Sequence, residues 1–186
     1  LTCRYTDRYP FVISPVSSTP MSARRLLTSG APAAPSLRFT LTPFMGAVIA
    51  IGATGWLSNL SGTPWLMASM GASCVLAFGV PDSPLAQPRS IIGGHVISTL
   101  VGLIILHTLG NSWWACALAV GLALVAMQQA RTLHAPAGAN PIVVLMTGAP
   151  LSFLLTPVLA GSIVIVVVAW CLNNTRHRGS YPKYWW

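Results

Sequence analysis

From Phe39 to Thr175 the chain carries only three formally charged residues, Asp82, Arg89 and Arg131. A surface in water carries charged side chains at much higher density, whereas the hydrocarbon core of a bilayer excludes them. Of the 186 residues 54% are hydrophobic, and the chain has only two acidic residues. This pattern predicts an all-α polytopic membrane protein and excludes an ordinary soluble domain.

The apolar stretches divide into segments at polar or proline-containing breaks. They cover residues 43–60, 64–80, 90–109, 112–130 and 142–172, the last one interrupted at "GAP", 148–150. Four pieces approach the roughly 20 residues that a spanning helix needs, whereas 64–80 and the piece before the "GAP" break are short. We expect about six membrane-embedded segments, four long spans plus two short or broken helices.

Basic residues outside these segments predict the orientation. They precede the first segment and follow the last one, at Arg24, Arg25, Arg38, Arg176, Arg178 and Lys183. The positive-inside rule then places both termini in the cytoplasm, with the turns near residues 61 and 111 on the other side. We divide the chain into a flexible basic tail (1–38), a transmembrane domain (39–175) and a cytoplasmic tail (176–186).

The predicted membrane is the bacterial inner membrane, with Met21 as an ordinary start just ahead of the first span. The alternative is an organellar envelope, in which the Ser-, Pro- and Arg-rich residues 1–38 act as a transit peptide.

An internal repeat is suggested by an offset of 67 residues. "ASMGAS" at 68–73 then falls on "APAGAN" at 135–140, and Gly94 falls on Gly161. Because three crossings separate equivalent segments, the repeat would be an inverted three-plus-three arrangement. Small residues at fourfold spacing predict close helix contacts; they are Gly94, Ser98 and Gly102 in one segment and Ala115, Ala119 and Ala123 in the next.

The stretch "HAPAGANP", 134–141, contains prolines and a glycine between two apolar runs. Asn140 before Pro141 predicts a helix start, as an N-cap followed by proline, and Ser73 is a weaker cap signal. Irregular backbone at membrane depth has to be buried or line a cavity, and helix starts attract anions. We therefore predict a substrate site; its backbone residues are Gly71, Ala72, Ser73, Gly138, Ala139 and Asn140. The alternative is that both breaks are packing kinks.

Polar side chains near the breaks are the other candidates. His95 and His134 are expected at membrane depth, where a histidine is a functional candidate, although a bond to a backbone carbonyl is an equally good interpretation. Gln87, Arg89 and Arg131 are accessory candidates, the arginines more simply as interfacial anchors. Neither the histidines nor the cysteines show metal-ligand spacing, and no catalytic arrangement is present, so we expect no metal, no cofactor and no enzymatic activity. The basic residues lack the interleaved aromatics of a nucleic-acid binder.

Three stretches resemble the HPP family of integral membrane proteins: "PWLMASMGAS" at 64–73, "SPLAQPRSIIGGH" at 83–95 and "HAPAGANP" at 134–141. The resemblance covers roughly 40–175. The signature His-Pro-Pro falls on His134, Ala135 and Pro136, so its middle proline is alanine here. Family members are commonly described with four transmembrane segments, and some are associated with nitrite transport. The resemblance thus implies transport of a small monovalent anion, plausibly nitrite.

The main hypothesis is a transporter or channel for a small inorganic anion, bound near mid-membrane at the starts of the two short helices. One alternative is a carrier of protons or neutral solutes that uses His95 and His134. Another is a membrane scaffold that transports nothing. The expected partners are the anion and the bilayer, and a homo-oligomer remains open.

Overall fold

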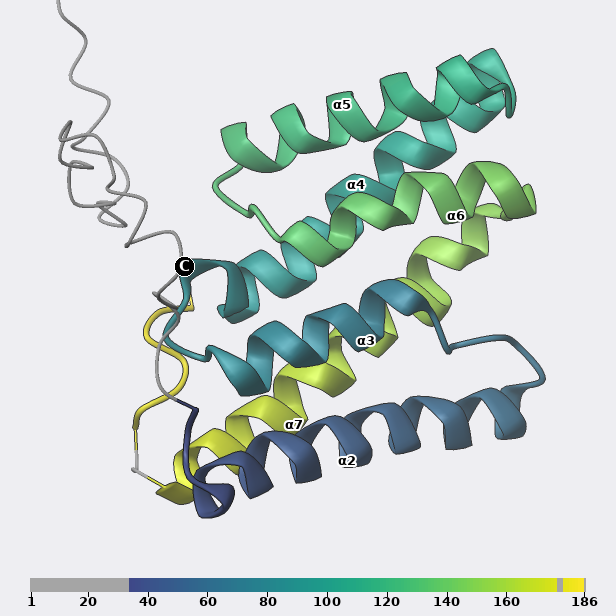
Figure 1. Ribbon diagram of the computed structural model, residues 1–186. Helices are drawn as coiled ribbons and strands as arrows, with labels where there is room; N and C mark the ends of the chain where they lie inside the picture. Colours follow the sequence, from purple (N-terminus) through teal and green to yellow (C-terminus); the bar gives the residue numbers. More distant parts are fainter. Residues whose placement is uncertain (1–33, 177–178, 186) are drawn as a thin grey trace, which may run out of the picture. The chain divides into compact units, whose positions relative to one another are not determined.

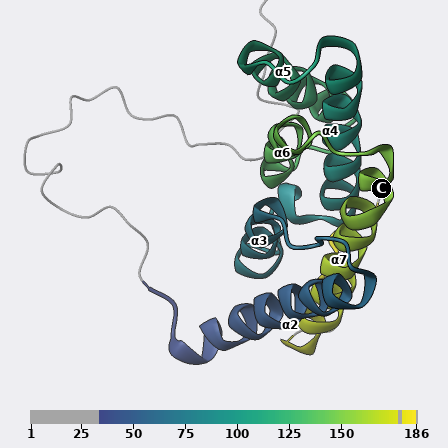
Figure 2. The same ribbon diagram turned by 90° about the vertical axis from the view of Figure 1, so that its right-hand side faces the viewer.

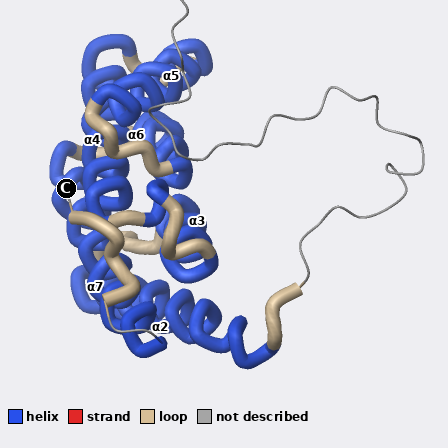
Figure 3. Tube along the Cα trace, turned by 90° about the vertical axis from the view of Figure 1, so that its left-hand side faces the viewer, coloured by secondary structure: helices blue, strands red, loops and turns tan. Residues whose placement is uncertain are grey.

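The computed structural model describes residues 34–176 and 179–185. All regular structure in these residues is helical, with loops between the helices (Figure 3). Most of the predicted basic tail, 1–38, lies outside the described residues.

Six α-helices follow one another along the described chain. They are α2 (Leu37–Ser61), α3 (Ala68–Cys74), α4 (Pro88–Leu109), α5 (Trp113–Gln129), α6 (Asn140–Thr147) and α7 (Ala160–Arg176). Short 3-10 or π-helical turns extend three of them: Val75–Gly79 after α3, Ala135–Ala139 before α6, and Leu151–Leu154 with Leu155–Leu159 before α7. A further 3-10 turn, Pro84–Ala86, lies between α3 and α4.

Within the described residues, three helical stretches are long and apolar enough to cross a bilayer: Phe39–Ser61, Pro88–Leu109 and Leu151–Thr175. The other three are shorter, at 68–79, 113–129 and 135–147. The expectation of four long spans is therefore not confirmed, because α5, the fourth candidate, has 17 residues. The two short or broken helices were predicted at the right places, around α3 and α6.

The helix boundaries follow from local chemistry. α2 begins before the predicted Pro43, because the Ser36 side chain accepts a hydrogen bond from the backbone N–H of Phe39. α6 ends as predicted at Gly148, whose left-handed backbone (φ 59°) is the conformation that glycine adopts without strain.

The helices pack as two groups of three. In Figures 1 and 2, α2, α3 and α7 lie together, and α4, α5 and α6 lie together. We call these the first and second helix groups. Each takes two consecutive helices from one half of the sequence and its third from the other half. Contacts between α3 and the turn before α6, and between α4 and α7, join the groups.

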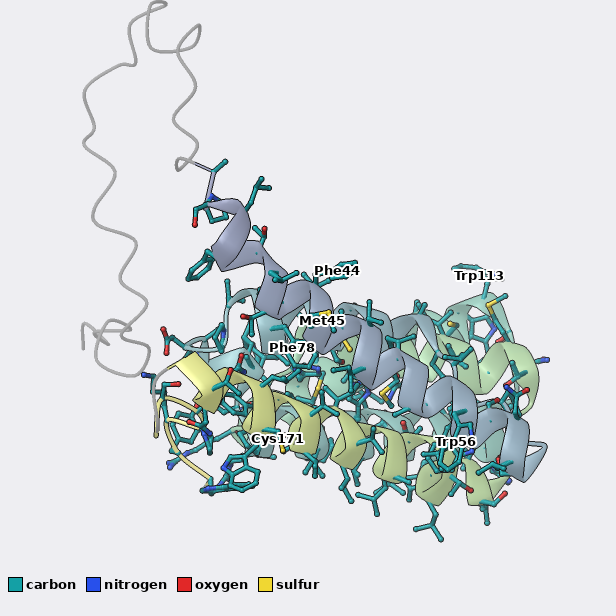
Figure 4. All side chains as sticks on the ribbon, turned by 90° about the horizontal axis from the view of Figure 1, so that it is seen from below. Phe44, Met45, Trp56, Phe78, Trp113 and Cys171 are labelled. Carbon is teal, nitrogen blue, oxygen red and sulfur yellow. The ribbon has the colours of Figure 1, made fainter. Side chains whose placement is uncertain are left out.

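The outward faces of the helices are apolar. Phe44, Met45 and Trp56 on α2 and Trp113 on α5, labelled in Figure 4, are large exposed hydrophobic side chains. Trp56 is 63% exposed and Trp113 is 84% exposed. Such side chains are suited to lipid contact, and tryptophan is enriched where lipid meets water. These exposed apolar side chains and the three long apolar helices are features of an integral membrane protein.

Small residues let α4 approach the second half of the chain closely. A Cβ atom on Gly94 would lie 2.6 Å from the His134 Cβ atom, and one on Gly102 would lie 2.9 Å from the Pro141 Cα atom. Between them, the Ser98 hydroxyl donates to the Ala137 carbonyl at 2.6 Å. The predicted close contact of this stripe is confirmed, and the segment it contacts is 134–144. The alanine stripe of α5 is also fully buried.

Candidate functional site: a buried histidine–serine cluster

Two histidines and a serine meet where the two helix groups join. The Ser73 Oγ atom lies 2.8 Å from the Nε2 atom of His95 and 2.8 Å from the Nε2 atom of His134. The two imidazole centroids are 5.1 Å apart, with ring planes inclined by 60°. α3 supplies the serine, α4 supplies His95, and the turn before α6 begins directly after His134. The fold thus brings together three polar side chains from three separate segments.

Asn140 and Thr99 extend this cluster on the other side of His95. The Asn140 Nδ2 atom lies 2.9 Å from His95 Nδ1 and donates to Thr99 Oγ1 at 2.9 Å. We call Ser73, His95, Thr99, His134 and Asn140 the central cluster. All five have 0% exposure. The Asn140 Oδ1 atom is buried without a hydrogen-bond partner, so the cluster keeps one free acceptor.

The acceptors determine where the protons lie. The Leu85 carbonyl, 2.7 Å from His134 Nδ1, can only accept, so this nitrogen carries a hydrogen. In the neutral ring, His134 Nε2 then accepts from the Ser73 hydroxyl. His95 Nδ1 faces the donating Asn140 amide, so its other nitrogen, Nε2, carries the hydrogen and donates to Ser73. This arrangement is a single chain of donors and acceptors with both histidines neutral.

The same contacts also accommodate one added proton. The Ser73 hydroxyl has a second acceptor, the Ser69 carbonyl at 2.8 Å. If His134 gains a proton, both Nε2–H groups can donate to the two lone pairs of Ser73 Oγ, and the Ser73 proton turns to Ser69. Every donor keeps an acceptor. Chemically, the cluster can therefore take up and release a proton without losing a hydrogen bond.

The charged residues lie elsewhere. Among the described residues no carboxylate takes part in the cluster, and Asp82, 78% exposed, pairs with Lys183 at 2.9 Å. Arg89 donates from Nε and Nη2 to the carbonyls of Arg131 and Ala130, at 3.2 and 3.0 Å. Those carbonyls directly follow the C-terminal end of α5, where a cation is favourable. The accessory candidates Arg89 and Arg131 thus meet each other, not the histidines.

Gln87, the third accessory candidate, holds a loop in shape. Its Nε2 atom donates to the carbonyls of Pro81 and Ser83, at 2.9 and 3.0 Å, and its Oε1 atom accepts from the Lys183 N–H at 2.8 Å. The side chain is fully buried. Both polar atoms of the side chain are hydrogen-bonded within the protein, so Gln87 stabilises the loop.

Both predicted helix caps are wrong. Ser73 lies within α3, which begins at Ala68, and its hydroxyl bonds to the carbonyl of Ser69 one turn earlier. Asn140 does begin α6, but a 3-10 turn precedes it, and its side chain bonds His95 and Thr99 without capping. The backbone amides that were expected to face an anion therefore lie within helical turns, and the cluster is built from side chains.

The other predicted backbone residues surround the cluster without joining its hydrogen bonds. Ala72 is exposed, Gly71, Gly138 and Ala139 are half-buried, and a Cβ atom on either glycine would meet nothing within 4 Å. Sequence reasoning missed Thr99 and the Leu85 carbonyl. Thr99 could have been found, because it lies four residues after His95 on the same helix face. A carbonyl leaves no such signal.

Comparison with known proteins adds the family context. The family described as "HPP, transmembrane region" matches residues 32–182. A curated transmembrane protein of Dictyostelium discoideum is 41% identical over 129 residues, which cover 65% of this chain and 45% of the relative. A second one is 39% identical over 132 residues, 67% of this chain and 42% of the relative. The chain thus spans less than half the length of these relatives. No solved structure matches it.

Proposed function

The chain belongs to the HPP family of transmembrane proteins, and from this premise we propose that it transports a small monovalent anion together with a proton. Nitrite is the first candidate substrate, on the strength of the family resemblance. The observation that carries the proposal is the central cluster, which is fully buried between two helix groups and can hold one added proton.

A proton and an anion fit this cluster better together than separately. A lone charge in a buried, low-dielectric place is costly, whereas a cation and an anion in contact carry no net charge. A protonated His134 would present a charge-assisted donor, and the Asn140 amide and the Ser73 hydroxyl are neutral donors nearby. Nitrite accepts hydrogen bonds at both oxygens. The role that helix starts had in the sequence-based hypothesis passes to these side chains.

The division of the cluster between the helix groups supports alternating access. Ser73 is its only member from the first helix group; the other four lie on α4, on α6 or just before the turn that leads to α6. Moving one group against the other would separate Ser73 from both histidines and open the space between them. The exchange of one helix between the sequence halves is the arrangement that an inverted repeat would give.

The remaining topology in this proposal follows the charges. The starts of α2 and α4 and the ends of α5 and α7 lie at one end of the helix groups, which also carries Asp82, Arg89 and Arg131 (Figure 1). We call it the basic end. The positive-inside rule assigns it to the cytoplasm. This orientation, and the choice of a bacterial inner membrane over an organellar one, belong to the proposal.

The test is uptake into proteoliposomes that contain the purified full chain. Nitrite, nitrate, formate and ammonium are offered with and without an inward proton gradient. We expect gradient-driven nitrite uptake that falls by about a hundredfold or more in His134→Gln, the size of effect that loss of a proton-transfer group produces. His107→Gln is the control, because His107 lies on α4 outside the central cluster, is exposed, and its Nδ1 atom bonds the Leu103 carbonyl.

The outcomes separate the candidates. The neutral network, in which every donor has an acceptor, also favours a carrier of protons or neutral solutes. Proton flux without anion uptake, again lost in His134→Gln, would select that alternative. If a correctly folded protein took up none of the solutes, the interpretation as a membrane scaffold that transports nothing would be supported.

A further inference from the structure

The segment Gly179–Trp185, which follows α7, is bound to the loop between α3 and α4. We call this segment the strap. The buried Tyr181 hydroxyl donates to the Ala86 carbonyl at 2.8 Å, and the Lys183 N–H donates to Gln87 Oε1 at 2.8 Å. At the strap's other side, Asn174 of α7 bonds both the carbonyl and the N–H of Tyr181, at 2.6 and 3.2 Å. The strap thus ties the end of α7 to this loop.

The same loop holds His134. The Leu85 carbonyl accepts from His134 Nδ1, and the next carbonyl, Ala86, accepts from Tyr181. Both carbonyls belong to the 3-10 turn Pro84–Ala86. A shift of this turn therefore moves the acceptor that selects the tautomer of His134. Tyr181 does not touch the histidine; it acts on the turn that does.

The strap also ends at a cavity. A cavity of about 450 Å³ at the basic end is lined by Trp185 together with Arg89, Gly93 and Thr132, among others. Two of its lining residues, Gly93 and Thr132, pack against each other, and Gly94, the neighbour of Gly93, packs against both Thr132 and His134. One short segment thus contacts both places: Trp185 lines the cavity, and Tyr181 binds the loop.

We propose that the strap is the closing element of the basic end and that Tyr181 is a positioning residue for His134, acting through the Pro84–Ala86 turn. With the strap docked, His134 is held in one tautomer and shielded; with the strap released, the turn relaxes and His134 becomes reachable from the cavity. An effect of strap release on transport rests on the proposed function. An effect of strap release on the accessibility of His134 does not depend on that function.

The first test is chemical modification of His134 by diethylpyrocarbonate, followed by peptide mass spectrometry of the full chain in proteoliposomes. Tyr181→Phe removes one hydroxyl and keeps the ring. Because one net hydrogen bond is lost, modification should speed up about two- to tenfold. Tyr184→Phe is the matched control, since the Tyr184 hydroxyl lies 3.5 Å from the Pro84 carbonyl on an exposed ring. Asn174→Ala, which removes both hydrogen bonds between Asn174 and Tyr181, should have the same effect as Tyr181→Phe.

The second readout is the pair of ¹⁵N resonances of His134, which report the nitrogen that carries the proton. We expect one tautomer in the wild type and in Tyr184→Phe, and a mixture in Tyr181→Phe. Unchanged modification and an unchanged tautomer in both Tyr181→Phe and Asn174→Ala would overturn the inference. Faster modification accompanied by equally faster maleimide labelling of the buried Cys74 would overturn it as well, because it would mean general loosening. A wild type without nitrite uptake would refute the proposed function and leave this test intact.

Discussion

Gly94→Ala is the substitution that tests the packing around the cluster most directly. The new Cβ atom would lie 2.6 Å from the His134 Cβ atom and 2.8 Å from the Thr132 carbonyl oxygen. Ordinary contacts begin near 3.4 Å, so the 132–134 segment would have to retreat by about 0.8 Å, the difference between 3.4 Å and 2.6 Å. One obstacle is backbone and the other is the first side-chain atom of His134, so no rotamer change relieves them.

Two effects of opposite sign follow for stability. Overpacking costs about 1–3 kcal/mol, whereas alanine gains about 1 kcal/mol over glycine inside a helix. Gly121→Ala on α5 isolates the second effect, because a Cβ atom there meets nothing within 4 Å. We expect Gly94→Ala to be less stable than Gly121→Ala by about 1–3 kcal/mol, since the helix term cancels in this comparison.

Gly94→Ala should also disturb the hydrogen bonds of the central cluster. His134 Nε2 lies 2.8 Å from Ser73 Oγ, and a retreat of this size would stretch that distance beyond hydrogen-bond range. Denaturant unfolding in detergent measures the stability difference, and proteoliposome uptake measures activity, which should fall at least about tenfold. Equal stability of the two alanine variants, together with wild-type uptake in Gly94→Ala, would refute the packing argument.

Three further predictions concern separate parts of the molecule. Asn140→Ala should cost about 1–3 kcal/mol, because it leaves His95 Nδ1 and the Thr99 hydroxyl buried without their partner; unfolding against the wild type measures it, and no loss would contradict the network. Reporters fused at residues 61 and 111 should both be non-cytoplasmic, and a cytoplasmic signal from either would contradict the orientation. Burial raises the pKa of the Tyr181 hydroxyl, so its contribution to docking is complete below the ordinary value of about 10 and is lost as pH rises above it. Phenolate absorbance should accordingly show one late-titrating group that is missing in Tyr181→Phe.

Much of the fold was predictable because the bilayer imposes simple rules on a sequence. The nearly charge-free stretch from Phe39 to Thr175 gave the membrane class, and the proline-containing breaks gave the two short helices. The predicted segment 112–130 extends one residue beyond α5 at each end, because Ser112 and Ala130 are the cap residues of the helix and the turn at Arg131 follows. Hydropathy reports where a segment is compatible with lipid, not where its backbone stops being helical.

The candidate site was predictable in its residues but not in its construction. Ser73, His95, His134 and Asn140 were all named from the sequence, and the fold brings these four together. Their use as a substrate site remains a prediction. The cap assignments failed because a serine or asparagine side chain can bond a local amide or a distant partner, and the choice depends on tertiary contacts. The Asn140 side chain bonds the distant His95 and does not cap its own helix.

The exchange of helices between the two groups determines what can move around this cluster. The chain passes from the first helix group to the second through residues 80–87, and back through residues 148–150. These two connections lie at opposite ends of the helices (Figure 1). Any rocking of one group against the other must bend at both. The strap binds the first connection and leaves the second untouched. In the proposed transport cycle, docking of the strap would therefore restrain opening at the basic end more than at the opposite end, which is an asymmetry that alternating access requires.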